Sequence, residues 1–447
     1  MSNAGPRPTD DISGTKPLVS VLMPIMAAVF IAFLVIGMAL PVLPLHVQQG
    51  LGLGTFLVGL VAGSQFAAAI LSRIWAGRHA DERGPKRAVI TGLMIAGGAG
   101  LVYLLSLTVE ARPPLSVAIL LAGRALLGIG ESFIITGGQS WALSILTVRN
   151  TSKAIAWIGS AMFAAFAAGA PVGTLLYTHY GFAAVAAATV VLPLATVLFI
   201  LPLEAVRPIR RAQAGFMKVM CSVWIPGAGA ALSSVGFGAI IAFSSLLFVA
   251  RGWAPWPAFS VFALVFIFAR LLLGHLADRF TAAKVAFFCV LVEATGLALI
   301  WLASNFSIGL LGTGLTGLGY SLVYPGLGVE AVRQVPAQSR GLAMGAYTAF
   351  LDIALGFGTP ALGLLAARAG LASVFVAGII GAFGAAGIAA GLWHKTPPSR
   401  DESPLACAET DPKGDRVAPC HRENVAWQVQ TRRRNGQRHD VHAALRP

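Results

Sequence analysis

Charged side chains that interrupt long apolar stretches are the residues of this sequence most able to do chemistry. Arg124, Glu131 and Asp352 lie well inside such stretches. A charge at the centre of a membrane helix costs about 2.5–3.5 kcal/mol, so it normally faces the protein interior or water. Arg124 and Glu131 are seven residues apart, which places them on one helix face, about 10 Å apart along its axis.

This arrangement predicts a polar site inside a membrane protein. We expect Glu131 to bind a polar solute or a proton, Arg124 to bias the ionisation of Glu131, and Asp352 to be a second proton site. The alternative is that each acid is a protonated partner in a buried hydrogen bond between helices. Arg73 and Arg270 are expected to form structural pairs.

Three further polar residues could contact a solute. Gln65, Tyr320 and Tyr324 can each hydrogen-bond a sugar-like or drug-like ligand. An aromatic residue in a membrane helix more often serves packing, which is the alternative for both tyrosines.

The composition predicts that these residues are positioned by membrane helices. Of 447 residues, 56% are hydrophobic and 11% are charged, whereas soluble domains carry about 25% charged residues. The apolar runs are continuous, unlike the alternating ~10-residue strands of a β-barrel. An all-α membrane protein of twelve transmembrane helices is expected, with spans near 18–46, 53–77, 88–109, 115–147, 153–178, 182–203, 219–250, 256–277, 282–303, 307–332, 340–367 and 371–393.

The distribution of basic residues predicts orientation. The net charge is +14, yet the loops after even-numbered spans hold fourteen Lys and Arg and those after odd-numbered spans hold three. Cytoplasmic loops carry this excess, so both termini are expected in the cytoplasm of a bacterial cell with the spans in its inner membrane. No nucleic-acid partner is implied. The four cysteines form no C-x-x-C pair, and no metal site or cofactor is expected.

The two halves of the chain repeat. Arg73–Asp81 resembles Arg270–Asp278 at an offset of 197, and Gly128–Ser132 resembles Gly317–Ser321 at an offset of 189. Two pseudo-symmetric six-helix bundles follow, 18–203 and 219–394. The other segments are a cytoplasmic N-terminal tail (1–17), a cytoplasmic linker (204–218) and a tail expected to be disordered (395–447).

Three motifs carry a resemblance to a known family. The first runs from Gly77 to Arg87, with Gly77, Asp81, Arg83, Gly84, Lys86 and Arg87 as its key residues and a copy at Gly274, Asp278 and Arg279. The second is Arg124 followed by Gly128 and Gly130. The third combines Gly169, Pro171 and Gly173, with Pro360 in its copy. Together they resemble the major facilitator superfamily.

The resemblance implies roles for these motifs. Asp81 would face the start of the span at 340–367, and Gly77 would let its helix approach a neighbour. This latch would stabilise an outward-open state. For Lys86 and Arg87, ordinary anchoring on the cytoplasmic side is the alternative. The glycines and prolines of the third motif would allow close approach and kinking.

The function implied is secondary transport by alternating access, with proton coupling through a buried carboxylate. The subgroup it most resembles is labelled as sugar (arabinose-type) or drug efflux. The partners would be a small solute, protons and membrane lipids, and the protein would act as a monomer. Uptake symport and passive facilitation are alternatives. A membrane-embedded enzyme would need a converging catalytic set, and ATP hydrolysis would need a P-loop; the sequence has neither.

Overall fold

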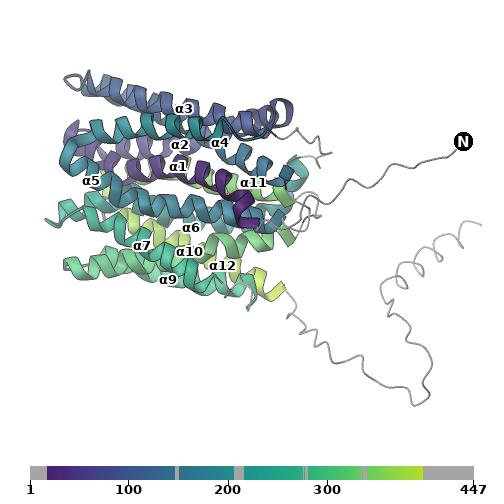
Figure 1. Ribbon diagram of the computed structural model, residues 1–447. Helices are drawn as coiled ribbons and strands as arrows, with labels where there is room; N and C mark the ends of the chain where they lie inside the picture. Colours follow the sequence, from purple (N-terminus) through teal and green to yellow (C-terminus); the bar gives the residue numbers. More distant parts are fainter. Residues whose placement is uncertain are drawn as a thin grey trace, which may run out of the picture. The chain divides into compact units, whose positions relative to one another are not determined.

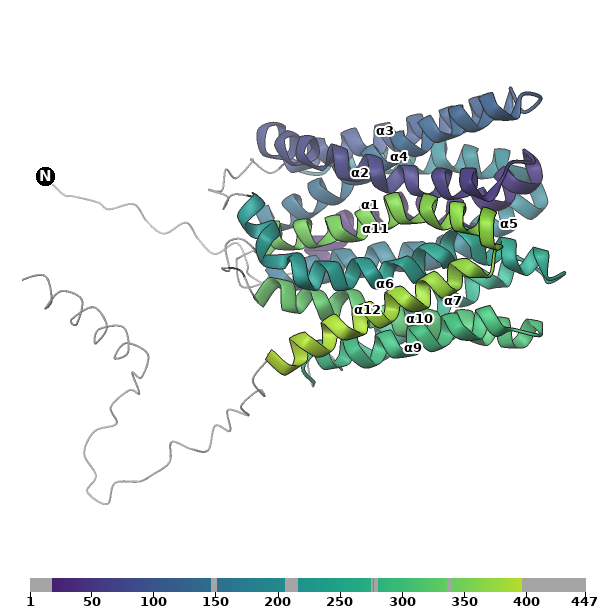
Figure 2. The same cartoon turned by 180° about the vertical axis from the view of Figure 1, so that it is seen from behind.

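The computed structural model describes residues 18–145, 151–205, 216–274, 276, 280–333, 335 and 340–395. Within these ranges the chain forms eleven α-helices and one π-helical turn, with no strands (Figures 1 and 2). Asp278 and Arg279, the tails 1–17 and 396–447, and most of the linker lie outside the described residues.

The helices coincide with the apolar stretches of the sequence. The first half contains α1 Leu18–Leu45, η1 His46–Gly50, α2 Thr55–Arg83, α3 Pro85–Leu107, α4 Pro113–Ile145 and α5 Thr151–Ile200. The second half contains α6 Phe216–Ala250, α7 Trp256–Leu273, α9 Ala282–Leu302, α10 Phe306–Arg333, α11 Arg340–Ala369 and α12 Ser373–Lys395. Eleven helices in the described part are long and apolar enough to cross a membrane. The chain is therefore a multi-pass membrane protein.

Helix α5 covers two of the expected spans and changes direction at Gly181. This residue has φ 72° and ψ −172°, which is not helical. The part before it packs on α1, where a Cβ at Gly169 would lie 2.6 Å from the Leu34 carbonyl oxygen. The part after it packs on α3, where a Cβ at Gly100 would lie 2.7 Å from the Val190 nitrogen.

Contacts at both ends of the part of α5 after Gly181 show in which direction this part runs. Phe182 and Leu107, the last residue of α3, line the same cleft. At the other end, Lys86 near the start of α3 donates a hydrogen bond to the Leu201 carbonyl oxygen at 2.8 Å. The part of α5 after Gly181 is therefore antiparallel to α3.

The junction of α2 and α3 differs from the loop that the sequence predicted. Residues up to Arg83 are helical, and Gly84 alone separates the helices. Gly84 has φ 95°, a region that favours glycine. Pro85 then begins α3, where its fixed φ and missing N–H suit a helix start.

The two halves contact each other through α2 and α11. A Cβ at Gly59 would lie 2.9 Å from the Thr359 carbonyl carbon, and one at Gly63 would lie 2.7 Å from the Gly356 carbonyl oxygen. The Thr359 hydroxyl donates to the Gly59 carbonyl oxygen at 3.0 Å. Small residues thus let the backbones approach closely, at the end of α2 that starts with Thr55.

The duplicated motifs occupy equivalent places. A Cβ at Gly128 of α4 would lie 2.8 Å from the carbonyl carbon of Gln65 in α2. A Cβ at its copy, Gly317 of α10, would lie 3.1 Å from the carbonyl carbon of Phe262 in α7. The halves therefore share backbone contacts although different side chains stand beside them.

Candidate functional site

Glu131 of α4 is held by Gln65 of α2. The Gln65 amide donates a hydrogen bond to Glu131 Oε2 at 2.6 Å, and both side chains are buried. Gly128, one turn before Glu131, lets α4 lie directly against α2 at this level. Glu131 therefore faces the protein interior and not the surface.

Arg124 also faces α2, as expected from its spacing to Glu131. Its Nε donates to the Val61 carbonyl oxygen at 3.2 Å, and Nη2 to that of Ala62 at 3.5 Å. The side chain is fully buried, and Nη1 has no hydrogen-bond partner among the described residues. Backbone carbonyl oxygens thus carry most of the polar contact that this cation makes.

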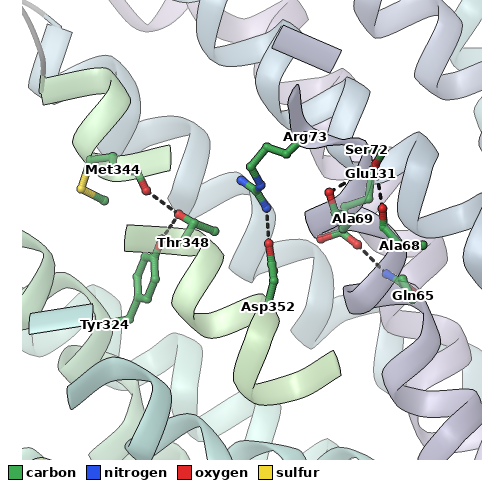
Figure 3. Close-up of polar contacts among 10 residues, drawn as sticks. All are labelled: Gln65, Ala68, Ala69, Ser72, Arg73, Glu131, Tyr324, Met344, Thr348 and Asp352. Atoms are coloured by element: carbon green, nitrogen blue, oxygen red, sulfur yellow. Dashed lines mark hydrogen bonds and ion pairs between the residues drawn. The ribbon is translucent and has the colours of Figure 1, made fainter. Parts of the chain in front are cut away.

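Asp352 of α11 pairs with Arg73 of α2. Arg73 Nη2 forms an ion pair and hydrogen bond with Asp352 Oδ2, and the side chains are 18% and 3% exposed. Figure 3 shows this pair in the middle of the polar cluster, with Glu131 and Gln65 beside it. The pair joins the two halves of the protein, and Glu131 lies within electrostatic reach of both members.

Tyr324 of α10 lies on the other side of this cluster (Figure 3). Its hydroxyl is 2.7 Å from the Thr348 hydroxyl, and the Tyr347 hydroxyl donates to its carbonyl oxygen at 2.8 Å. The hydroxyls of Tyr324 and Thr348 thus extend the polar cluster into the second half.

Tyr320 lies in an aromatic cluster. Its ring stacks on Phe237 at 4.8 Å between centroids, and its hydroxyl is 3.0 Å from that of Ser234. By the repeat offset of 189, Tyr320 is the copy of Glu131. An apolar cavity of about 10 Å³ lies beside this cluster, between Phe166 of the first half and Phe262 of the second.

The Gly77–Arg87 motif makes few contacts. Asp81, Arg83 and Arg87 are exposed. Asp81 forms no hydrogen bond or ion pair with the described residues, and the start of α11, which it was expected to face, includes side chains that lie outside the described part. A Cβ at Gly77 would meet no heavy atom within 4 Å, and the same holds for Gly345 of α11. Gly77 therefore has no close neighbour among the described residues in this conformation.

The other motif residues differ in role. Lys86 Nζ contacts the carbonyl oxygens of Leu201 and Leu203 at the end of α5. Gly274 follows the last residue of α7. Lys86 fits an anchoring function at a helix end, where a cation is favourable, whereas Gly274 keeps a helical conformation, with φ −55° and ψ −31°.

The third motif acts through close approach. Gly169 and Gly173 pack against the α1 backbone at Leu34 and Met38, and Pro360 packs against Gly59 and Gly63. The non-helical residue of α5 is Gly181, ten residues beyond Pro171. Gly181 thus marks the turn between the two expected spans, whereas Pro171 lies inside the first of them.

Two charged residues have partners that the sequence did not predict. Arg73 was expected to form a structural pair, but it joins the halves at the polar cluster. Glu293 of α9 was not singled out from the sequence, yet it is fully buried and accepts a 2.6 Å hydrogen bond from Ser233. Their positions as charges inside apolar stretches were the available signal.

A duplicated helical membrane bundle with charged residues buried between its halves is the architecture of a solute transporter. The comparisons with known proteins agree. The Major Facilitator Superfamily profile matches residues 25–259 and 252–434. The chain belongs to this superfamily, and it is a membrane transporter and not an enzyme.

The relatives share most of the chain. An uncharacterized MFS-type transporter of Salmonella typhimurium is 42% identical over 356 residues, covering 79% of this chain and 92% of the relative. The uncharacterized MFS-type transporter YhhS of Escherichia coli is 37% identical, covering 78% and 86%. Among solved structures, an inward-facing, unoccupied bacterial homolog of the human lysosomal transporter Spinster has a TM-score of 0.68 at 16% identity, covering 86% of this chain and 99% of that one.

Proposed function

We propose that this protein is a proton-coupled secondary transporter that exports a small solute by alternating access. The observation that carries the proposal is the Arg73–Asp352 pair, which joins the halves beside a second buried acid, Glu131. A buried ion pair loses several kcal/mol when one partner is neutralised. Protonation of Asp352 would therefore release α2 from α11, and proton binding would change the contact between the halves.

Glu131 supplies the second step of this mechanism. Its Oε2 is held by Gln65, and Arg73 lies within electrostatic reach. When Asp352 is neutral, Arg73 gains from turning toward Glu131, the other acid near it. One arginine shared by two acids would thus connect proton binding in one half to the charge state of the other half.

The contacts between α2 and α11 support the assignment of this conformation to one state of the transport cycle. The two helices approach closely at the Thr55–Ala67 end of α2, whereas a Cβ at Gly77 or Gly345 would meet open space. The closed end is the outer one in the orientation that the basic loops predict, with both termini in the cytoplasm. We therefore assign this conformation to the inward-facing part of the cycle. Asp81 would engage α11 only in the outward-open state, as a latch.

The aromatic residues between the halves favour an amphiphilic solute over a sugar. The cavity between the halves is lined by phenyl rings from α5, α6 and α7. A sugar needs many hydrogen-bonding partners, whereas rings bind apolar or aromatic bodies. In this conformation the cavity, at about 10 Å³, has room for about one water molecule, so a drug-like molecule would reach the rings only when the halves move apart.

The membrane arrangement follows from α5. A straight helix of its 50 residues would be about 75 Å long, more than twice a hydrocarbon core of about 30 Å. With the chain folded back at Gly181, α5 supplies two spans. Twelve spans in a bacterial inner membrane, with both termini cytoplasmic, complete the proposal.

Transport in proteoliposomes tests the coupling. The purified protein is assayed with a radiolabelled drug and sugar panel under an imposed pH gradient. We expect the gradient to drive drug-like solutes in the wild type, and Asp352→Asn and Glu131→Gln to abolish the dependence on the gradient. Glu293→Gln is the matched control, because Glu293 also accepts a 2.6 Å hydrogen bond in a buried site but lies outside the cluster.

The outcome separates the alternatives. Gradient-driven movement in the proton direction would indicate uptake symport, and movement in all variants without any gradient dependence would indicate a passive facilitator. Normal coupling in both Asp352→Asn and Glu131→Gln would remove these acids from the mechanism.

A further inference from the structure

A polar cleft lies within the first half of the protein, away from the Arg73–Asp352 cluster. Its volume is about 600 Å³, within the range of small-molecule sites. Three segments line it: the π-helical turn η1, the end of α3 with the turn that follows, and the Gly181 corner of α5. All three meet at the end of the bundle where α1 and α3 finish.

His46 gives the cleft a buried polar group. The side chain is almost fully buried, and its ring stacks on Phe182 at 4.2 Å between centroids and an angle of 11°. Its Nε2 lies 4.0 Å from Glu110 Oε1, beyond hydrogen-bond distance, and has no hydrogen-bond partner in the described part of the chain. His46 also begins a π-helical turn, a rare conformation that is frequent at functional sites.

The chemistry of the lining selects the charge of a ligand. Glu110 accepts hydrogen bonds, and so does His46 Nε2 in the neutral tautomer that carries its proton on Nδ1. Tyr177, Tyr180 and Phe182 add aromatic rings, and no Lys or Arg is among the lining residues. A carboxylate beside aromatic faces favours ammonium groups, through charge-assisted hydrogen bonds and cation–π contact.

We propose that this cleft binds a ligand through its ammonium group, held between Glu110 and His46 and against the aromatic rings. The separation of Nε2 and Oε1 leaves room for one nitrogen to donate to both atoms. Two sources share this chemistry: a free organic amine, and the headgroup of phosphatidylethanolamine at the membrane edge. The proposal is independent of the transport site, because none of its residues belongs to that site.

Binding to the purified full-length protein tests the free-amine source. Phenethylamine and the uncharged 2-phenylethanol are compared by calorimetry in detergent. We expect binding of the amine and not of the alcohol, and about tenfold weaker binding by Glu110→Gln, the loss typical of one hydrogen bond to a charged group. Glu204→Gln, which removes another exposed carboxylate, should bind as the wild type does.

Native mass spectrometry tests the lipid source. Protein from mixed lipids should retain phosphatidylethanolamine over phosphatidylglycerol, and Glu110→Gln should lose this preference. Tyr180→Ala, at an exposed position, is the second variant if Glu110→Gln melts at a lower temperature than the wild type. Binding in one arm identifies the source. Equal binding of amine and alcohol, no binding in either arm, or wild-type binding by both variants would overturn the proposal.

Discussion

The close approach of α2 and α11 at Gly59 predicts a substitution that shifts the conformational equilibrium. A Cβ added at Gly59 would lie 2.9 Å from the Thr359 carbonyl carbon and 3.1 Å from the Pro360 Cα. Both are backbone atoms, which cannot move aside as a flexible side chain can. Gly59→Ala therefore forces the two helices apart at this end.

The magnitude follows from two opposing effects. Overpacking at a tight contact costs about 1–3 kcal/mol, and this cost arises only in the state where the helices touch. The gain in helix propensity of about 1 kcal/mol applies in every state and cancels between them. A net cost of about 2 kcal/mol would move the population by about thirtyfold toward the state in which this end is open.

Spin labels measure the shift. Phe56→Cys on α2 and Leu364→Cys on α11, both at partly exposed positions, are introduced after replacing the native cysteines, and their separation is measured by pulsed electron resonance. Gly59→Ala should populate a longer distance. Gly98→Ala is the control, because its Cβ would meet nothing within 4 Å. An unchanged distribution in a stably folded Gly59→Ala protein, or an equal shift in the control, would refute the reasoning.

Three further predictions concern stability, measured as melting of the purified protein. Asp352→Asn leaves Arg73 without its carboxylate and should cost about 3–5 kcal/mol, whereas adding Arg73→Gln should restore most of the loss; additive losses would contradict the pairing. Gly181→Ala forces a side chain into a backbone region reserved for glycine and should cost about 1–3 kcal/mol, while Gly159→Ala, at an open helical position, should be neutral or stabilising. Lys86→Gln removes a cation from the end of α5 and should cost about 0.3–1 kcal/mol, and the exposed Arg87→Gln should cost less.

The sequence predicted the helices because their main determinant is local. A run of apolar residues bounded by Gly, Pro and charge sets a span whatever its neighbours are. The predicted limits of the spans 88–109, 256–277 and 282–303 were therefore close to those of α3, α7 and α9. The end of α2, in the motif after Gly77, was harder to predict, because Arg, Ala and Glu continue a helix well beyond the apolar stretch. The helix α2 ends at Gly84, which has a positive φ and stands directly before Pro85.

The partners of the buried charges depend on contacts between distant residues, which spacing on one helix does not reveal. The positions of Arg124 and Glu131 on one face followed from helical geometry, and both do face α2. That Asp352 would meet Arg73 depends on the depth at which α2 and α11 cross. This depth is set by Gly59, Gly63 and Thr359, whose mutual contact the sequence could not show.

The repeat explains why the chemistry is divided unequally between the halves. Gly128 and Gly317 make the same backbone contact in each half, so the duplicated frame is kept. Beside the first stand Gln65 and Glu131, and beside the second stand Phe262 and Tyr320. A glycine contact constrains only the backbone, which leaves the facing side chains free to diverge. At this pair of positions the first half therefore holds a carboxyl group while the second offers aromatic rings, and the Arg73–Asp352 pair joins the halves.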